Sequence, residues 1–270
     1  MTSMSILHVD KLTKSFGDKE AIIDVSFDIT EGAITGFLGP NGAGKSTVMN
    51  IIMGFIGATS GQVRVFNQAV SANSPETRKN LGFLSNSSKL DHSLTVAQEI
   101  EYYGNLGGKY NQSYVEELIE RLQLDVTQKI GGLSTGNYQK TALVIALMHK
   151  PKLLILDEPT NGLDPLVQAE FNKIIFELKE SGSTVFVSSH ILSEVQEICD
   201  EFIFIKNGRI AAQLTRADLL SSTDKIVTVK TTSENHDKTM KYLSENKIEH
   251  HVDGKDLDGV FMKYYGDDNA

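Results

Sequence analysis

The sequence predicts an α/β fold with a mostly parallel β-sheet, and three patterns support this prediction. Residues 153–156 and 184–187 form two short runs that are apolar on both faces, as in strands that helices cover on both sides. Residues 165–179, which lie between them, favour a helix. Residues 33–38 form a third apolar run, which leads directly into a glycine-rich loop and then into a helical stretch at residues 46–53.

An antiparallel β-subdomain is expected before this core, within residues 5–30. The apolar side chains of Ile23, Val25, Phe27 and Ile29 alternate with polar residues along the chain. A period of two is typical of a half-buried strand, and such strands usually belong to antiparallel sheets.

The rest of the chain completes the predicted domain organisation. A long stretch that favours helices predicts a helical subdomain inserted at about residues 87–150. The dipeptide Asn207-Gly208 between two apolar runs predicts a hairpin. Because the composition changes after about residue 222, we expect one large domain at residues 1–222 and a small α+β appendage at residues 223–270.

Composition and charge narrow the classes of function. The chain has 270 residues and a formal net charge of −9, whereas a protein that grips nucleic acid is usually basic, so we expect no nucleic-acid partner. The single cysteine, Cys199, cannot form an intramolecular disulfide, which favours a reducing compartment, and we expect it to be a buried helix residue. No apolar run approaches the roughly 20 residues that span a bilayer. The first residues lack the charge pattern of a signal peptide.

The strongest functional pattern is the loop GPNGAGKST at residues 39–47, which matches G-x-x-x-x-G-K-[ST]. Its glycines let the backbone curl so that N–H groups point at phosphate oxygens, and the following helix adds its positive N-terminal end. Lys45 can reach the β- and γ-phosphates of ATP, and the Ser46 hydroxyl can ligate Mg²⁺. This P-loop NTPase pattern predicts a set of nucleotide-binding residues: Gly39, Pro40, Asn41, Gly42, Ala43, Gly44, Lys45, Ser46 and Thr47.

Two carboxylates follow the apolar run at residues 153–156, and a histidine follows the run at residues 184–187. Ligand sites in open α/β sheets lie at the carboxyl ends of the strands. We therefore expect Asp157 near the Mg²⁺ and Glu158 near the γ-phosphate, where Glu158 can orient or deprotonate the attacking water. His190 is expected close to the same phosphate.

Other segments resemble the ATPases of the ATP-binding cassette (ABC) family, and the resemblance covers about residues 6–220. Residues 133–137, with the sequence LSTGN, resemble the family's signature segment, and residues 159–165, with the sequence PTNGLDP, resemble its D-loop. His190 matches the family's switch histidine. Phe16 falls where the family places an aromatic residue against the adenine ring.

The resemblance implies how such a protein works. Two cassettes meet head to tail and enclose two ATP molecules, so that Ser134 and Gly136 of one chain contact the γ-phosphate held by Lys45 of the other. Asp164 belongs to the D-loop at the same interface. A helix that begins at Ser134 is suited to this contact because a helix N-terminus attracts anions. The second cassette would be another copy of this chain or a paralogous one.

The same resemblance implies a membrane partner. The helical subdomain would face a transmembrane permease subunit, which would place the chain at the cytoplasmic face of the cell membrane. The ATP-driven dimerisation and hydrolysis would then power transport.

Three positions depart from the common family pattern. Thr135 replaces a signature glycine and Asn137 replaces the signature glutamine. Asn86 stands where the family has a glutamine that binds nucleotide and Mg²⁺, and it has the same amide on a side chain shorter by one methylene. With these changes, the sequence resembles the branch of cassettes that serves ABC-2-type exporters, including sodium-extrusion and drug- or peptide-resistance ATPases.

Two other functions remain open at this point. A soluble cassette acting on ribosomes or DNA usually has two cassettes, a long charged linker or a coiled-coil insertion, and this acidic chain shows none of them. A nucleotide-binding module with little hydrolysis is suggested by Asn86 and the altered signature, whereas Glu158 and His190 argue for hydrolysis. The acidic residues at positions 194–201 are expected to form a solvated helix face.

Overall fold

The computed structural model describes residues 4–70, 80–85, 89–108, 110–221 and 241. The chain divides into two compact units, Met1–Arg216 and Ala217–Ala270. The first unit contains every element discussed below except most of the short helix α8 (Arg216–Ser221). Most of the predicted C-terminal appendage, and Asn86, lie outside the described residues.

The N-terminal part of the first unit is a four-stranded antiparallel sheet with the order β2-β1-β4-β5. Its two long strands, which the sequence predicts, pair with each other, and the sheet also contains two strands that the sequence does not predict. The bounds are β1 (Ser5–Phe16), β2 (Lys19–Thr30), β4 (Ser60–Val65) and β5 (Gln68–Ala69).

The predicted alternation in β2 is confirmed for Val25, Phe27 and Ile29, which are buried, but it is wrong for Ile23, which is only half-buried. Asp24 has a φ of 54°, and the pairing with β1 is irregular at this point. This bulge puts one extra residue into β2, so Ile22 takes the buried position instead.

The second sheet has six strands in the order β10-β9-β3-β8-β7-β6, and all neighbours are parallel except the hairpin pair β9 and β10. The mostly parallel sheet and the hairpin are therefore confirmed, whereas β6 is not predicted. The bounds are β3 (Ile34–Leu38), β6 (Leu81–Leu84), β7 (Leu153–Asp157), β8 (Thr184–Ser189), β9 (Glu201–Lys206) and β10 (Arg209–Thr215). Every residue of β3, β7 and β8 is buried, which explains the mostly apolar runs within them.

The core of the first unit lies around α1 (Lys45–Ile52), which contacts β2, β4 and β7 and so packs between the two sheets. Three rings join the sheets: Phe27, Phe37 and Phe186 have centroids 5.3–5.7 Å apart. These contacts fix the loop that precedes α1 against the centre of the parallel sheet.

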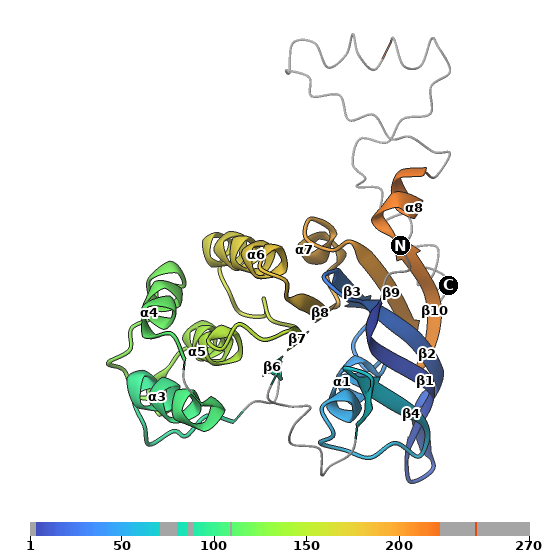
Figure 1. The fold of residues 1–270 in the computed structure, drawn as a ribbon, viewed down its shortest axis with the longest axis horizontal. Helices are drawn as coiled ribbons and strands as arrows, with labels where there is room; N and C mark the ends of the chain where they lie inside the picture. Colours follow the sequence, from blue (N-terminus) through green and yellow to red (C-terminus); the bar gives the residue numbers. More distant parts are fainter. Residues whose placement is uncertain (1–3, 71–79, 86–88, 109, 222–240, 242–270) are drawn as a thin grey trace. The chain divides into compact units, whose positions relative to one another are not determined.

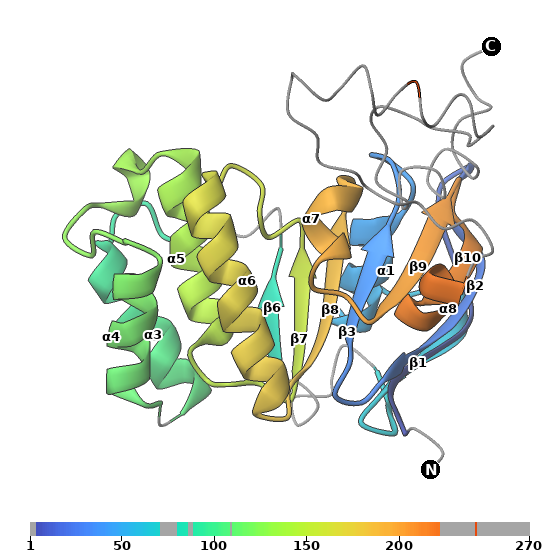
Figure 2. The ribbon, with the colours of Figure 1, turned by 90° about the horizontal axis from the view of Figure 1, so that it is seen from above.

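A mostly helical region lies beside β6, at the end of the parallel sheet away from the antiparallel one (Figures 1 and 2). It contains α3 (Val96–Gly107), α4 (Gln112–Arg121), the 3₁₀ turn η1 (Ile130–Gly132) and α5 (Thr135–Leu147). Each α-helix begins at a side-chain cap, provided by Thr95, Asn111 and Ser134. Helices α6 (Pro165–Glu180) and α7 (Leu192–Gln196) follow β7 and β8 and contact β8.

The acidic residues after His190 form the predicted solvated helix face only in part: Glu197 is exposed, whereas the other three carboxylates are partly buried. Glu194 accepts hydrogen bonds from Thr160 and Ser189, and Glu201 accepts from Thr30 and Thr35. In the same run, Asp200 accepts the backbone N–H of Ile34 and the ammonium group of Lys179. These carboxylates join strands and loops, because the chain leaves the helix at Gln196 and returns to the sheet.

Cys199 is fully buried, as predicted, but it lies after α7 and not within a helix. Within the described residues, no helix combines the length and the apolar character needed to cross a bilayer.

Candidate functional site

The glycine-rich loop connects β3 to α1 and folds tightly against its surroundings. Gly42 and Gly44 have φ values of 81° and 110°, which disfavour any residue with a side chain. A Cβ atom at Gly39 would meet the backbone oxygen of Ile205, and one at Gly44 would lie 2.9 Å from the backbone oxygen of Ala21. The glycines of the motif are therefore needed for backbone conformation and close packing.

The N-terminus of α1 is open to an anion. Gly44 is its N-cap without a side-chain bond, and the first turn contains no acidic residue. The backbone N–H groups and the positive end of the helix dipole therefore have no competing carboxylate in this turn.

Lys45 is the first residue of α1, and its side chain is buried to 5% exposure. Its ammonium group donates to the carbonyl oxygens of Gly39 and Pro40 at 2.7 and 3.2 Å. It also lies 3.5 Å from Oε1 of Glu158. Burial lowers the pKa of Lys45 and outweighs the opposing effect of Glu158.

Asp157 and Glu158 stand at the carboxyl end of β7, beside the end of β8. Asp157 is 2% exposed, and the hydroxyl of Ser188 donates to its Oδ1 at 2.6 Å. The same hydroxyl accepts the backbone N–H of Glu158 at 3.0 Å. Ser188 thus fixes both acidic residues through one oxygen atom.

The carboxylate of Glu158, which follows β7, lies close to side chains from α1 and from the segment after β8. Its Oε1 lies 3.5 Å from Nζ of Lys45 on α1 and 3.3 Å from Nδ1 of His190, which follows β8. The His190 contact is within ion-pair range but lacks the geometry of a hydrogen bond, and the ring is 36% exposed. A small pocket opens beside Glu158 and His190. It is also lined by Thr160, Asn161, Gly162, Leu163, Gln168, Ser189, Ile191 and Glu194.

The structure brings together three of the residues that the sequence singles out, Lys45, Glu158 and His190, with Asp157 adjacent through Ser188. Ser46 follows Lys45 and is exposed. Its hydroxyl and the Asp157 carboxylate are oxygen donors, the type that Mg²⁺ prefers, so this donor set fits the ion. Phe16 is 53% exposed at the end of β1, with the ammonium group of Lys14 4.9 Å from the ring centroid.

A second group of predicted residues lies where α5 meets the loop before α6. The exposed Ser134 accepts the N–H of Asn137 and caps α5, and Asp164 accepts two N–H groups and caps α6. A Cβ atom at Gly136 would lie 2.7 Å from the carbonyl oxygen of Gly162. The two segments touch because both positions are glycine.

Sequence reasoning missed two residues at this site. The sequence assigns no role to Ser188, although a hydroxyl at the end of a buried strand is a signal for a polar partner there. The sequence assigns no contact to Gln139, whose side-chain amide donates to the carbonyl oxygens of Glu158 and Pro159 at 3.2 and 3.0 Å.

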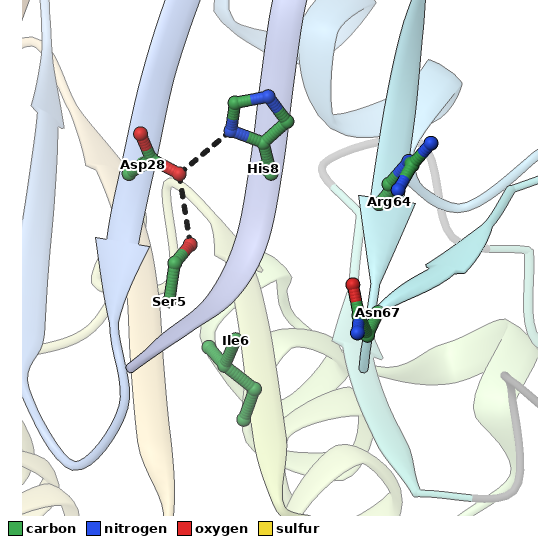
Figure 3. Close-up of a pocket in the computed structure, with 6 residues that line it drawn as sticks. All are labelled: Ser5, Ile6, His8, Asp28, Arg64 and Asn67. Atoms are coloured by element: carbon green, nitrogen blue, oxygen red, sulfur yellow. Dashed lines mark hydrogen bonds and ion pairs between the residues drawn. The ribbon is translucent and has the colours of Figure 1, made fainter. Parts of the chain in front are cut away.

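A separate pocket lies on the antiparallel sheet (Figure 3). Ser5 donates to Oδ1 of Asp28 at 2.9 Å, and Nδ1 of His8 lies 2.7 Å from the same oxygen. Arg64 and Asn67 line the opposite side, and Ile6 lies between the two groups. None of the residues predicted from the sequence lines this pocket.

Comparison with known proteins points to one family. The family model described as "ABC transporter" matches residues 22–161. An uncharacterized ABC transporter ATP-binding protein of Bacillus subtilis, YdbJ, is 34% identical over 82% of this chain and 73% of its own length. The bacitracin transport ATP-binding protein BcrA of Bacillus licheniformis is 34% identical over 78% of this chain and 70% of its own length.

Solved structures show the same fold. An ATP-binding subunit of an ABC transporter superposes with a TM-score of 0.76 at 23% identity, over 96% of this chain and 99% of that one. A dimeric ATP-binding cassette bound to ADP and Pi, in a post-hydrolysis state, gives a TM-score of 0.70 at 25% identity, over 77% of this chain and 98% of that one.

Proposed function

The chain belongs to the ABC transporter family, and from this membership we propose that it is the ATP-binding and ATP-hydrolysing subunit of a membrane exporter. The observation that carries the proposal is the convergence of Lys45 and His190 on one carboxylate oxygen of Glu158. A cation for the phosphates, a base for the water and a second phosphate sensor are thus adjacent.

ATP binding uses the loop before α1. The phosphates approach the backbone N–H groups at residues 39–47 and the open N-terminus of α1. Lys45 exchanges its contacts with the Gly39 and Pro40 carbonyls for the β- and γ-phosphate oxygens. The adenine ring stacks on Phe16, whose exposed face is available for it.

Ser46 and Asp157 would hold Mg²⁺, directly or through water, and the ion would supply positive charge to the phosphate oxygens. Asp157 is suited to this role because Ser188 holds one of its oxygens and leaves the other for the ion or its water. Asn86, also proposed as a ligand, lies outside the described residues.

Hydrolysis uses Glu158 and His190. A water molecule beside the Glu158 carboxylate loses a proton to it and attacks the γ-phosphorus, and the bond from that phosphorus to the β–γ bridging oxygen breaks. ADP and phosphate are the products. His190, next to the same carboxylate, contacts the γ-phosphate and orients the water.

The site is completed by a second cassette in a head-to-tail dimer. Ser134 and Gly136 then face the γ-phosphate of the partner's ATP, with the N-terminus of α5 directed at it. Asp164 belongs to the same interface, which its exposed position at the start of α6 allows. The second cassette is a copy of this chain or a paralogue.

A transmembrane permease subunit is the proposed partner of the helical region. Tyr102 and Leu106, one turn apart on α3, are each more than half exposed, so their neighbouring side chains offer an apolar surface on this helix. Docking there would place the chain at the cytoplasmic face of the membrane. The relative BcrA is named for bacitracin transport. Small antibiotic-like molecules are therefore the class of transported substrate to test first.

Two measurements test this proposal. Affinity-tagged chain, purified from detergent-solubilised membranes, should retain a polytopic membrane protein, and Tyr102→Ser with Leu106→Ser should release it. The purified complex should hydrolyse ATP, and Glu158→Gln should lower kcat by about 100-fold or more while ATP still binds. Equal rates for the wild type and Glu158→Gln would refute the assignment of the base.

A further inference from the structure

Glu158 has an unusual backbone. Its φ of 50° lies in the left-handed region, which a residue with a side chain adopts only when its surroundings hold it there. A turn follows, in which Pro159 takes the second position and the N–H of Asn161 donates to the carbonyl oxygen of Glu158 at 3.2 Å. The direction of the Glu158 carboxylate therefore depends on how firmly this turn is fixed.

Two side chains from distant parts of the chain hold the turn. Ser188 on β8 accepts the N–H of Glu158 at 3.0 Å. Gln139 on α5 donates its side-chain amide to the carbonyl oxygens of Glu158 and Pro159 at 3.2 and 3.0 Å. Of these two residues, Gln139 lies in the helical region, on α5, whereas Ser188 lies in the parallel sheet, on β8.

We propose that Gln139 is a positioning residue for hydrolysis, which fastens the turn after Glu158 to helix α5 and so holds the catalytic carboxylate in place. The proposal rests on the role of Glu158 as the base. It accounts for the amide at position 139, because the side-chain NH₂ of Gln139 provides an N–H to each of the two carbonyl oxygens.

Gln139 also links the turn after Glu158 to the N-terminal end of α5. It lies five residues after Ser134, the cap of α5, and the same helix end packs against the loop before α6 through Gly136 and Gly162. In a head-to-tail dimer the N-terminus of α5 contacts the partner's ATP. On this proposal, a shift of α5 on binding that ATP would reach the base of this chain's own site through Gln139.

The test replaces the donor and keeps the shape. Gln139→Met has a side chain of nearly the same length and no N–H, and Gln139→Lys retains a donor. The matched control is Gln213→Met, because Gln213 on β10 also donates to a backbone carbonyl, that of Ser26 at 3.2 Å, away from the site. ATPase rates, ATP affinity and melting temperature are measured for each variant in the purified complex.

Gln139→Met is expected to lower kcat by roughly 10- to 100-fold, the scale for a misplaced catalytic group. The Kd for ATP should stay within about twofold, because the phosphate loop is untouched. Gln139→Lys should recover most of the rate, and Gln213→Met should match the wild type. A purely structural role would instead lower the melting temperature or change all kinetic constants together, and this result, or an unchanged kcat, would overturn the proposal.

A double-mutant cycle separates this inference from the proposed function. In the Glu158→Gln background, Gln139→Met should have little further effect on the residual single-turnover rate, because no base remains to be positioned. Additive losses would overturn the inference. If the wild type itself fails to hydrolyse ATP, or equals Glu158→Gln, the proposed function fails first, whereas an active wild type with an unaffected Gln139→Met refutes only the positioning role.

Discussion

The ammonium group of Lys45 lies 3.5 Å from Oε1 of Glu158, so the cation of the phosphate loop and the carboxylate at the end of β7 contact each other directly. Both side chains are largely buried, and Lys45 donates to two loop carbonyls as well. In the proposed function, a bound triphosphate would draw Lys45 away from these partners and leave the Glu158 carboxylate to accept a proton from water. ATP binding would then activate the proposed base by breaking this ion pair.

Lys45→Met should weaken ATP binding by about 10-fold or more and abolish detectable hydrolysis. A bond between a cation and a phosphate contributes roughly 1.5–3 kcal/mol, and each 1.4 kcal/mol is a tenfold change in affinity. Titration calorimetry with ATP measures the affinity. Lys173→Met is the control, because Lys173 is exposed on α6 and pairs only with Glu170 among the contacts described, and an equal loss in this control would contradict the assignment.

Gly136→Ala should reduce ATP hydrolysis strongly while leaving ATP binding to the isolated chain nearly unchanged. The added methyl group would lie 2.7 Å from the carbonyl oxygen of Gly162, so the signature segment and the loop before α6 must separate. Gly132→Ala is a matched control, since a Cβ atom there meets nothing within 4 Å. Cross-linking of nucleotide-bound dimers would report the altered interface, and normal dimers with normal turnover would contradict the prediction.

Arg121→Met should lower the free energy of unfolding by about 1–2 kcal/mol at pH 7, a modest value because two of the three partner carboxylates are more than half exposed. Arg121 joins α4 to α6 through Glu170 at 2.7 Å and Glu177 at 2.6 and 2.8 Å. Arg121→Lys should be intermediate, because an ammonium group cannot form the paired bonds to Glu177.

The same network makes a prediction about pH. Hydrogen bonds from Lys173 and Arg121 lower the pKa of Glu170, and hydrogen bonds from Arg121 lower the pKa of Glu177, from the ordinary value of 4.5. Carboxyl groups with a lowered folded-state pKa stabilise the protein above the unfolded pKa and lose that contribution as pH falls through the folded pKa. The difference between wild type and Arg121→Met, measured by urea unfolding, should therefore be full at pH 7 and shrink below pH 4.5. A constant difference would show that packing alone explains the effect.

Cys199 should not react with thiol reagents while the protein is folded. Burial raises the pKa of its thiol. The sulfur also packs closely against Gly36, since a Cβ atom added there would lie only 3.0 Å from it. Labelling with a chromogenic disulfide should be absent in buffer and complete in denaturant, with a rate that follows unfolding. Rapid labelling of the native protein would mean that the segment after α7 opens locally.

The sequence predicts those parts of the fold that a local pattern specifies. The fully buried strands β3, β7 and β8 contain the short apolar runs seen in the sequence, and the hairpin of β9 and β10 follows from Asn207-Gly208. The short strands β4 and β6 have weaker patterns, because the partners that bury them lie elsewhere in the chain. The register of β2 could not be predicted at Ile22 and Ile23, because the bulge at Asp24 is fixed by pairing with β1.

The candidate site divides in the same way. Sequence motifs identify some of the site residues, because these residues stand at fixed spacing in one loop or directly after one strand. They are Gly39, Lys45, Asp157 and Glu158. The meeting of Lys45 and His190 at Glu158 could only be inferred from strand order. The hydrogen bonds from Gln139 to the Glu158 carbonyl and from Thr160 to Glu194 could not be inferred at all, because they join residues 19 and 34 positions apart through tertiary packing.

The left-handed backbone of Glu158 has an evolutionary consequence. For most residues this conformation is less stable than the right-handed one by roughly 1–2 kcal/mol, whereas glycine adopts it freely. Glycine at position 158 would relieve this backbone strain, but it would also remove the carboxylate that lies beside the buried ammonium group of Lys45, and the resulting protein would not turn over ATP. Screens that rank variants of this chain by expression or melting temperature do not detect the loss of the carboxylate at this position, so stability and turnover should be selected together.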